Sequence, residues 1–175
     1  MLTSSSELLD IVDDQDQVIA TLTRGEIHQR GLTHRSVHVL VFDDAGSIVL
    51  QKRSALKDEC PGLWDSSCAG HVESGQSYLE TAPRELMEEL GIAIEQPMQE
   101  LFKMPPNADN GFEFAMVYKL VHNGPFVAAE DEIDQLQWFS AEHINEWIAG
   151  DERDELTSGF KEIWNRYCEF GSSAA

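Results

Sequence analysis

Residues 70–92 read GHVESGQSYLETAPRELMEELGI and hold the most informative pattern of the chain. The second half of this segment predicts a helix over Leu79–Leu90, which Gly91 ends as a C-cap. An α-helix has about 3.6 residues per turn, so residues three and four apart share a face. One face of the predicted helix therefore carries three carboxylates, and another carries apolar side chains that can pack on a sheet. The first face comprises Glu85, Glu88 and Glu89, and the second comprises Leu79, Ala82, Leu86 and Leu90.

Three carboxylates on one face repel one another unless their charge is compensated. On a solvated helix a like-charge pair costs only about 0.2–0.5 kcal/mol. In a partly enclosed site, with an effective dielectric near ~20, the repulsion reaches roughly 3 kcal/mol per pair. An enclosed cluster therefore favours bound cations, and carboxylate oxygens suit Mg²⁺ or Mn²⁺. The alternative for the helix alone is a solvated acidic face, which is common in a chain whose net charge is −20.

The residues that flank the helix favour the metal site. Together with the helix they resemble the Nudix box, G-x5-E-x7-R-E-U-x-E-E-x-G-U with U aliphatic, and match every defined position but one. The resemblance extends over about residues 35–140. It implies an α/β (α+β) Nudix fold, in which a mixed β-sheet is sandwiched between helices. It also implies cleavage of a phosphoanhydride bond in a nucleoside diphosphate-linked or related small phosphorylated substrate.

The same resemblance implies roles for individual residues. The implied metal ligands are the catalytic carboxylates Glu85, Glu88 and Glu89 and the backbone carbonyl of Gly70. Arg84 is implied as a catalytic residue that orients these carboxylates. The implied cofactor is Mg²⁺, which Mn²⁺ could replace. Such a metal polarises phosphoryl oxygens and lowers the pKa of the attacking water.

Two residues depart from the expected pattern. Gln76 stands where the family has Glu, and a neutral amide cannot neutralise additional metal ions. This predicts weak binding of further metals and modest activity. Pro83 lies inside the predicted helix and removes one backbone hydrogen bond. Because Ser77 and Glu80 have the spacing of a capping box, we expect an irregular first turn rather than a missing one.

A further carboxylate is expected in the acidic loop before the last core strand, because hydrolases of this fold often take a base or extra ligand from it. Glu132 is the predicted catalytic residue of this loop, and Glu130 is the second choice. The alternative is an acidic surface turn.

The segments before the box resemble isopentenyl-diphosphate isomerase, which shares the Nudix fold. They are His34-Arg35, Gln51–Lys57, Pro61–Trp64 and Gly70-His71. This resemblance implies that Arg53 and Lys57 bind a diphosphate, since fixed cations complement phosphate oxygens, and it adds Arg35 to the substrate-binding residues. The alternative is a set of solvated surface cations.

The chemistry of the isomerase carries over less well than its scaffold. Ala69 stands at the place of the catalytic cysteine, and Cys68, one position away, is predicted to be a small packing residue. The isomerase's metal histidines are partly echoed by His28, His34 and His71, and its pair of Glu on a later strand is represented by Glu113 alone. With a nearly intact box, the chain resembles the bacterial isomerase-like Nudix hydrolases. An isomerase-like enzyme and a weakly active nucleotide-binding module remain the alternatives.

Composition and charge limit the partners and the compartment. A net charge of −20 repels a phosphate backbone, so a nucleic acid polymer is not an expected partner. Three cysteines without a CxxC pair favour a reducing compartment, and we expect the cytoplasm. The first 17 residues lack the pattern of a signal peptide, and no apolar run is long enough to span a membrane. A monomer or homodimer is expected.

The pattern along the chain predicts one domain with an N-terminal addition. Residues 1–34 are predicted to form a hairpin and a short helix packed on the domain, residues 35–170 the Nudix domain, and residues 171–175 a tail. Strands are expected at 8–12, 18–22, 36–42, 47–53, 98–104, 112–121 and 133–139, and further helices at 24–30, 140–148 and 154–168. Residues 54–75 are expected to be mostly loop.

Overall fold

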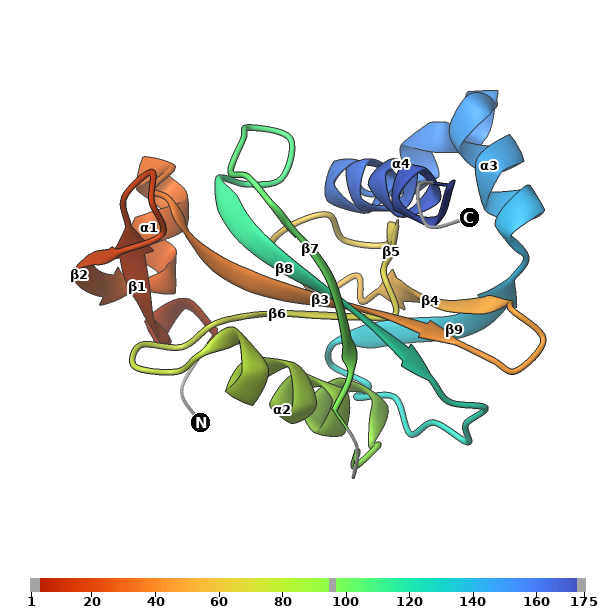
Figure 1. Ribbon diagram of the computed structural model, residues 1–175. Coiled ribbons are helices and arrows are strands. Elements are labelled where there is room, and N and C mark those ends of the chain that lie inside the picture. Colours follow the sequence, from red (N-terminus) through yellow and green to blue (C-terminus); the bar gives the residue numbers. More distant parts are fainter. Residues whose placement is uncertain (1–3, 95–96, 173–175) are drawn as a thin grey trace.

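A mixed seven-stranded β-sheet forms the centre of the computed structural model, which describes residues 4–94 and 97–172 (Figure 1). The strand β3 (His34–Phe42) pairs in parallel with β8 (Glu113–Val121) along its whole length, and β7 (Gln99–Met104) pairs antiparallel to β8. On its other side β3 pairs with two antiparallel strands, one near each of its ends. The remaining strands are β4 (Ile48–Arg53), β5 (Trp64–Asp65), β6 (Cys68–His71) and β9 (Ile133–Phe139).

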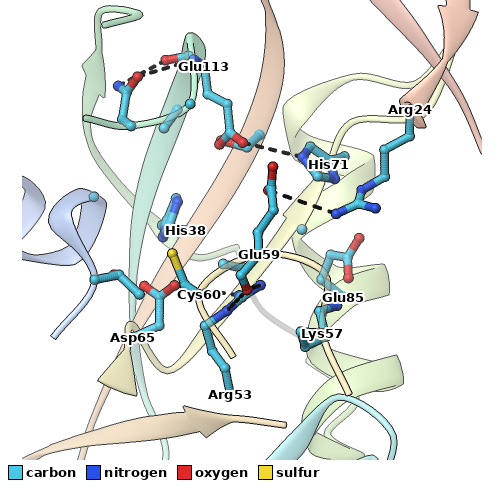
Figure 2. A pocket seen from close by; sticks show the side chains of 18 of the residues that line it. Arg24, His38, Arg53, Lys57, Glu59, Cys60, Asp65, His71, Glu85 and Glu113 are labelled. Carbon is cyan, nitrogen blue, oxygen red and sulfur yellow. Dashed lines mark hydrogen bonds and ion pairs between the residues drawn. The ribbon is translucent and has the colours of Figure 1, made fainter. Parts of the chain in front are cut away.

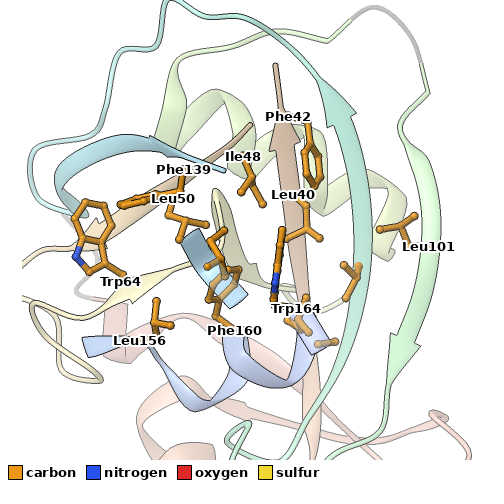
Figure 3. Close-up of a cluster of buried hydrophobic side chains, with 14 of the residues drawn as sticks. Leu40, Phe42, Ile48, Leu50, Trp64, Leu101, Phe139, Leu156, Phe160 and Trp164 are labelled. Atoms are coloured by element: carbon orange, nitrogen blue, oxygen red, sulfur yellow. The ribbon is translucent and has the colours of Figure 1, made fainter. Parts of the chain in front are cut away.

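Helices cover both faces of the sheet, because successive side chains of β3 point to opposite sides. One set of buried side chains lies against α2 (Tyr78–Leu90) and includes Val37, Val39, Val41, Leu86 and Leu90. The other set lies against α4 (Ser158–Ser172) and includes Leu40, Phe42, Phe160 and Trp164 (Figure 3). The short helix α3 (Ala141–Ala149) adds Ile144 to the second set. The predicted sandwich of a mixed sheet between helices is confirmed.

The structure corrects the start of the predicted last helix. A 3-10 turn, η2 (Asp151–Glu155), precedes α4, which begins at Ser158 rather than near residue 154. The reason is that Leu156 forms a bridge to Trp64 and the Thr157 hydroxyl accepts from the Phe160 N–H, so the chain is extended before the helix starts. Residues 54–75 are mostly loop, as predicted, and include the short strands β5 and β6.

The helix α2 is regular from its first residue, so the predicted irregular first turn is wrong. Both hydrogen bonds of the capping box between Ser77 and Glu80 are present, and they stabilise the turn that precedes Pro83. Leu79 was expected on the packing face, but it is 67% exposed in that first turn. The packing face therefore begins at Ala82, which is fully buried.

The N-terminal hairpin and its short helix form as predicted and pack beside the start of α2. They comprise η1 (Ser4–Ser6), β1 (Leu8–Val12), β2 (Val18–Thr23) and α1 (Arg24–Arg30). The Ser74 N–H donates to the Leu8 carbonyl, and Leu9 forms a bridge to Glu73. Of the predicted tail, residues 173–175 lie outside the described part, whereas 171–172 continue α4. No helix in the described ranges has the length and apolar character needed to cross a bilayer.

Asp16, at the tip of the hairpin, fastens this unit to the domain. Its carboxylate accepts from Arg35 Nε at 2.6 Å, from the Tyr78 hydroxyl at 2.9 Å and from Lys103 Nζ at 2.5 Å. The Asp16 side chain is only 12% exposed. Arg35, predicted to bind substrate, is thus engaged in holding the hairpin.

Asp16→Asn is expected to destabilise the protein by about 2 kcal/mol, because it leaves partly buried cations without their counter-charge. Asn tolerates the positive φ of 60° at this position, so the loss of stability would not come from backbone strain. Urea unfolding measures the effect, and Asp14→Asn, an exposed residue in the same turn, is the matched control. Equal stability of the two variants would show that Asp16 is not an anchor.

Candidate active site

A cleft of about 1430 Å³ opens where α2, β6, the β4–β5 loop and α1 come together (Figure 2). Glu85, Glu88 and Glu89 of α2 line one wall, and Gly70 of β6 lies beside them. His71 and Glu113 line another part of the same cleft. The structure therefore brings the predicted residues of the box and His71 together in one cleft.

Two of the three box carboxylates are buried. Glu89 is 6% exposed, and its Oε2 accepts from the Ala69 N–H and from Gln51 Nε2, each at 3.2 Å. Glu85 is 8% exposed and lies 3.0 Å from the Arg84 guanidinium. Burial raises the pKa of Glu89 to about 7, and burial together with the charge of Glu89 raises the pKa of Glu85 to about 8. The enclosed cluster, unlike a solvated acidic face, favours a bound cation.

Arg84 forms hydrogen bonds both to residues of the box and to the backbone of β6. Its Nη2 donates to the His71 carbonyl at 3.2 Å, and its Nη1 donates to Glu88 at 2.8 Å. Its Nε donates to the side-chain oxygen of Gln76 at 3.3 Å. The amide of Gln76 thus accepts a hydrogen bond from the orienting arginine, a role that needs an acceptor and no charge. Arg84 is placed to orient the carboxylates.

Gly70 lies so close to the carboxylates that a side chain there would displace Glu85. A Cβ atom at this position would meet the Glu85 Cδ at 2.0 Å and its two carboxylate oxygens at 2.1 and 2.4 Å. The glycine therefore lets the backbone of β6 approach the carboxylates closely. Backbone carbonyl and carboxylate oxygens together form a donor set suited to Mg²⁺ or Mn²⁺.

The cations of the cleft are held by acidic neighbours. Arg53 Nη1 lies 3.6 Å from Asp65, and Lys57 forms a short ion pair with Glu132. The predicted diphosphate-binding lysine and the predicted base are therefore direct neighbours. Arg35 is not brought to the cleft, because its guanidinium donates to Asp16 on the hairpin.

Sequence reasoning missed Arg24, a cleft cation from the first turn of α1. It is 7% exposed and pairs with Asp58 at 3.5 Å and with Glu59 at 3.9 Å. Sequence spacing could not reveal it, because its partners lie more than 30 residues away on the β4–β5 loop.

Three histidines and one glutamate form a second group of potential metal ligands beside the box. One ligand atom from each of His28, His34, His71 and Glu113 lies within 4.8 Å of the others. His34 Nδ1 faces the Leu32 carbonyl at 2.9 Å, and His28 Nδ1 faces Glu59 at 2.8 Å. Within the described residues, the buried Nε2 atoms of His28 and His34 lack a hydrogen-bond partner. Such atoms are free to bind a metal.

The charge states of this group also suit a transition metal. Burial lowers the pKa of His71 to about 4, so its imidazole is neutral near pH 7. Burial alone would raise the pKa of Glu113, but contacts with His34 and His71 hold it well below its usual range. Imidazole nitrogens and a carboxylate are ligands that Zn²⁺ and similar ions prefer.

Comparison with known proteins shows the family of the chain. Residues 32–160 match the model of the NUDIX domain. The chain is 38% identical to an uncharacterized Nudix hydrolase of Yersinia pestis over 138 residues, which cover 79% of this chain and 75% of that one. It is 31% identical to the isopentenyl-diphosphate Delta-isomerase of Serratia proteamaculans over 143 residues, 80% of each chain. The crystal structure of DR0079 from Deinococcus radiodurans superposes with a TM-score of 0.82 at 27% identity, covering 91% of this chain and 98% of that one. The chain belongs to the Nudix hydrolase family.

Proposed function

We propose that the protein is a Mg²⁺-dependent hydrolase of a nucleoside diphosphate-linked or related small phosphorylated substrate. The observation that carries the proposal is the burial of Glu85 and Glu89 together against the backbone of β6. With Glu88 and the Gly70 carbonyl, these carboxylates would hold Mg²⁺ or Mn²⁺. The bound metal would polarise the phosphoryl oxygens and activate the attacking water. Free cysteines at positions 60, 68 and 168 support a reducing compartment such as the cytoplasm.

The residues of the cleft have separate tasks in this proposal. Arg53 and Lys57 bind the phosphate groups, and Arg84 keeps the carboxylates oriented. Glu132, which pairs with Lys57, is the proposed base. A phosphate bound at Lys57 competes for the ammonium group and frees the Glu132 carboxylate to accept a proton.

An isomerase activity is the second candidate, and the group of three histidines and Glu113 favours it. We propose that this group holds a transition metal such as Zn²⁺ or Mn²⁺. The position of the isomerase's catalytic cysteine is Ala69, however, and Cys68 is fully buried in the core under α2. Proton exchange of isopentenyl diphosphate in deuterated water tests this activity, and we expect none.

A substrate panel tests the leading proposal. The protein is incubated with Mg²⁺ and nucleoside di- and triphosphates, nucleotide sugars and dinucleotides, and phosphate, pyrophosphate and monophosphate are measured. Product formation that EDTA abolishes is expected for at least one class. Calorimetric binding of a nucleotide without any product would instead indicate a binding module, the role that Gln76 left open.

The stability of the metal-free protein should depend on pH through the box carboxylates. In the folded state the pKa is about 8 for Glu85 and about 7 for Glu89, above the ordinary value of 4.5. Between pH 4.5 and these pKa values, the folded state therefore binds more protons than the unfolded state. Stability therefore falls as the pH rises from about 4.5 to about 8. A bound cation removes this penalty.

Thermal unfolding with EDTA or with Mg²⁺, at pH 5.5 and at pH 8.5, checks this expectation. Mg²⁺ should raise the midpoint more at the higher pH, and Glu89→Gln should reduce the difference. An equal gain at both pH values would count against metal binding by these carboxylates.

A further inference from the structure

Glu59 joins the histidine group to the loop that carries the phosphate-binding cations. It lies in the β4–β5 loop, two residues after Lys57, and its side chain crosses the cleft to α1 (Figure 2). Its Oε1 is 2.8 Å from His28 Nδ1, and its Oε2 is 3.9 Å from Arg24. Its backbone carbonyl accepts from Arg53 Nε and Nη2 at 3.2 and 3.1 Å. One residue thus contacts a potential metal ligand and a substrate-binding arginine.

The contact with Glu59 determines which nitrogen of His28 faces the histidine group. An ionised carboxylate can only accept hydrogen bonds, so His28 Nδ1 carries the proton. In the neutral ring Nε2 then carries the free lone pair, and it lies within the group formed with His34, His71 and Glu113. A carboxylate behind a histidine ligand fixes its tautomer and orientation and increases its basicity. His28 is therefore arranged as a metal ligand by a residue from another segment of the chain.

We propose that Glu59 is a positioning residue that couples metal binding at the histidine group to the order of the β4–β5 loop. The inference rests on the transition-metal site of the proposed function. A metal on His28 Nε2 would polarise the imidazole and strengthen the hydrogen bond that its Nδ1–H donates to Glu59. The backbone carbonyl of Glu59 also accepts hydrogen bonds from Arg53. The metal would therefore stabilise the β4–β5 loop in the conformation in which Arg53 and Lys57 face the cleft. Linkage is reciprocal, so an ordered loop must in turn strengthen metal binding.

Zn²⁺ binding tests the coupling without relying on catalysis. Transition metals are first removed from the full chain. Excess Mg²⁺ is then added to occupy the site of the box carboxylates, and Zn²⁺ is titrated into the protein by calorimetry. Glu59→Gln is expected to lower the Zn²⁺ affinity about tenfold or more. The matched control is Asp58→Asn, because Asp58 is the adjacent acidic residue and pairs with Arg24, whereas His28 pairs with Glu59. It should change the affinity by less than about twofold.

Hydrogen exchange of residues 54–63 gives the second readout. Zn²⁺ should slow exchange of this loop in the unaltered protein and in Asp58→Asn, but not in Glu59→Gln. Equal Zn²⁺ affinities of the unaltered protein and Glu59→Gln, equal losses in both variants, or exchange that Zn²⁺ does not change would overturn the proposal.

The variant His34→Ala separates the coupling from the site. If it loses Zn²⁺ binding while Glu59→Gln retains it, the histidine site stands and the role of Glu59 is refuted. Failure of the unaltered protein to bind Zn²⁺ would refute both. Neither result bears on hydrolysis by the box carboxylates, which the substrate panel tests.

Discussion

Glu89→Gln is expected to lower Mg²⁺-dependent hydrolysis by a factor of about 10²–10³, a loss typical of removing a key electrostatic group from a transition state. Glu89 is the most enclosed of the three box carboxylates, and its Oε2 is held by Ala69 and Gln51. An amide oxygen can accept the same two hydrogen bonds, so the fold should persist while the negative charge is lost. Initial rates at saturating Mg²⁺ on the best substrate of the panel measure the effect.

Glu88→Gln provides the comparison for this variant. The Glu88 side chain is 57% exposed and pairs with Arg84, so its removal perturbs the orienting arginine and leaves the buried pair in place. We expect a loss of about tenfold, because the charge of an exposed ligand is partly replaced by solvent. Thermal midpoints close to that of the unaltered protein show that both variants are folded. A rate for Glu89→Gln within twofold of the unaltered protein would refute the assigned role.

Gly70→Ala is expected to lower the rate by about 10²-fold and the stability by about 1–3 kcal/mol. The added methyl group would stand 2.0 Å from the Glu85 Cδ, so either β6 or the carboxylate must move. The carbonyl and the carboxylate that would share the metal cannot then keep their positions. Calorimetric Mg²⁺ binding should weaken along with the rate.

Gly159→Ala is the matched control for Gly70→Ala. Gly159 borders the same cleft from α4, and a Cβ there meets nothing within 4 Å. Its rate and Mg²⁺ affinity should be unchanged. Combining Gly70→Ala with Glu85→Gln should cost little more than the larger single effect, since both substitutions act on one carboxylate. Full activity of Gly70→Ala would contradict the close approach.

The parts of the site that depend on local spacing could be predicted from the sequence. The positions of Glu85, Glu88 and Glu89 follow from helical periodicity, and the structure places them on the cleft side of α2. Ser77 and Gly91 marked the two ends of that helix correctly, because caps are local hydrogen-bonding events. Residues 36–42 were likewise predicted to form a strand, and they make up most of β3.

The parts that depend on contacts between distant segments could not be predicted. Arg35 has the residue type of a phosphate ligand, but the hairpin tip at Asp16 takes its guanidinium. Arg24 and Glu59 gave no signal, because they meet only when α1 packs against the β4–β5 loop. The start of α4 at Ser158 follows from the pairing of Leu156 with Trp64, which lies far earlier in the chain.

The side chain of Gln76, where the motif has Glu, makes two hydrogen bonds beside the box. Loss of a carboxylate at this position predicted weaker binding of additional metals. The structure adds that the remaining amide oxygen accepts from Arg84 and from the Thr81 hydroxyl, at 3.3 and 3.2 Å. The contact with Arg84 is thus made by an acceptor without charge.

The most direct test of the central claim is the position of the metal itself. A crystal soaked in Mn²⁺ reports that position in an anomalous difference map. The proposal predicts a peak in contact with the carboxylates of Glu85 and Glu89 and the carbonyl of Gly70. A map without a peak there, or with a peak only among His28, His34, His71 and Glu113, would contradict the assignment of the box carboxylates as the metal site.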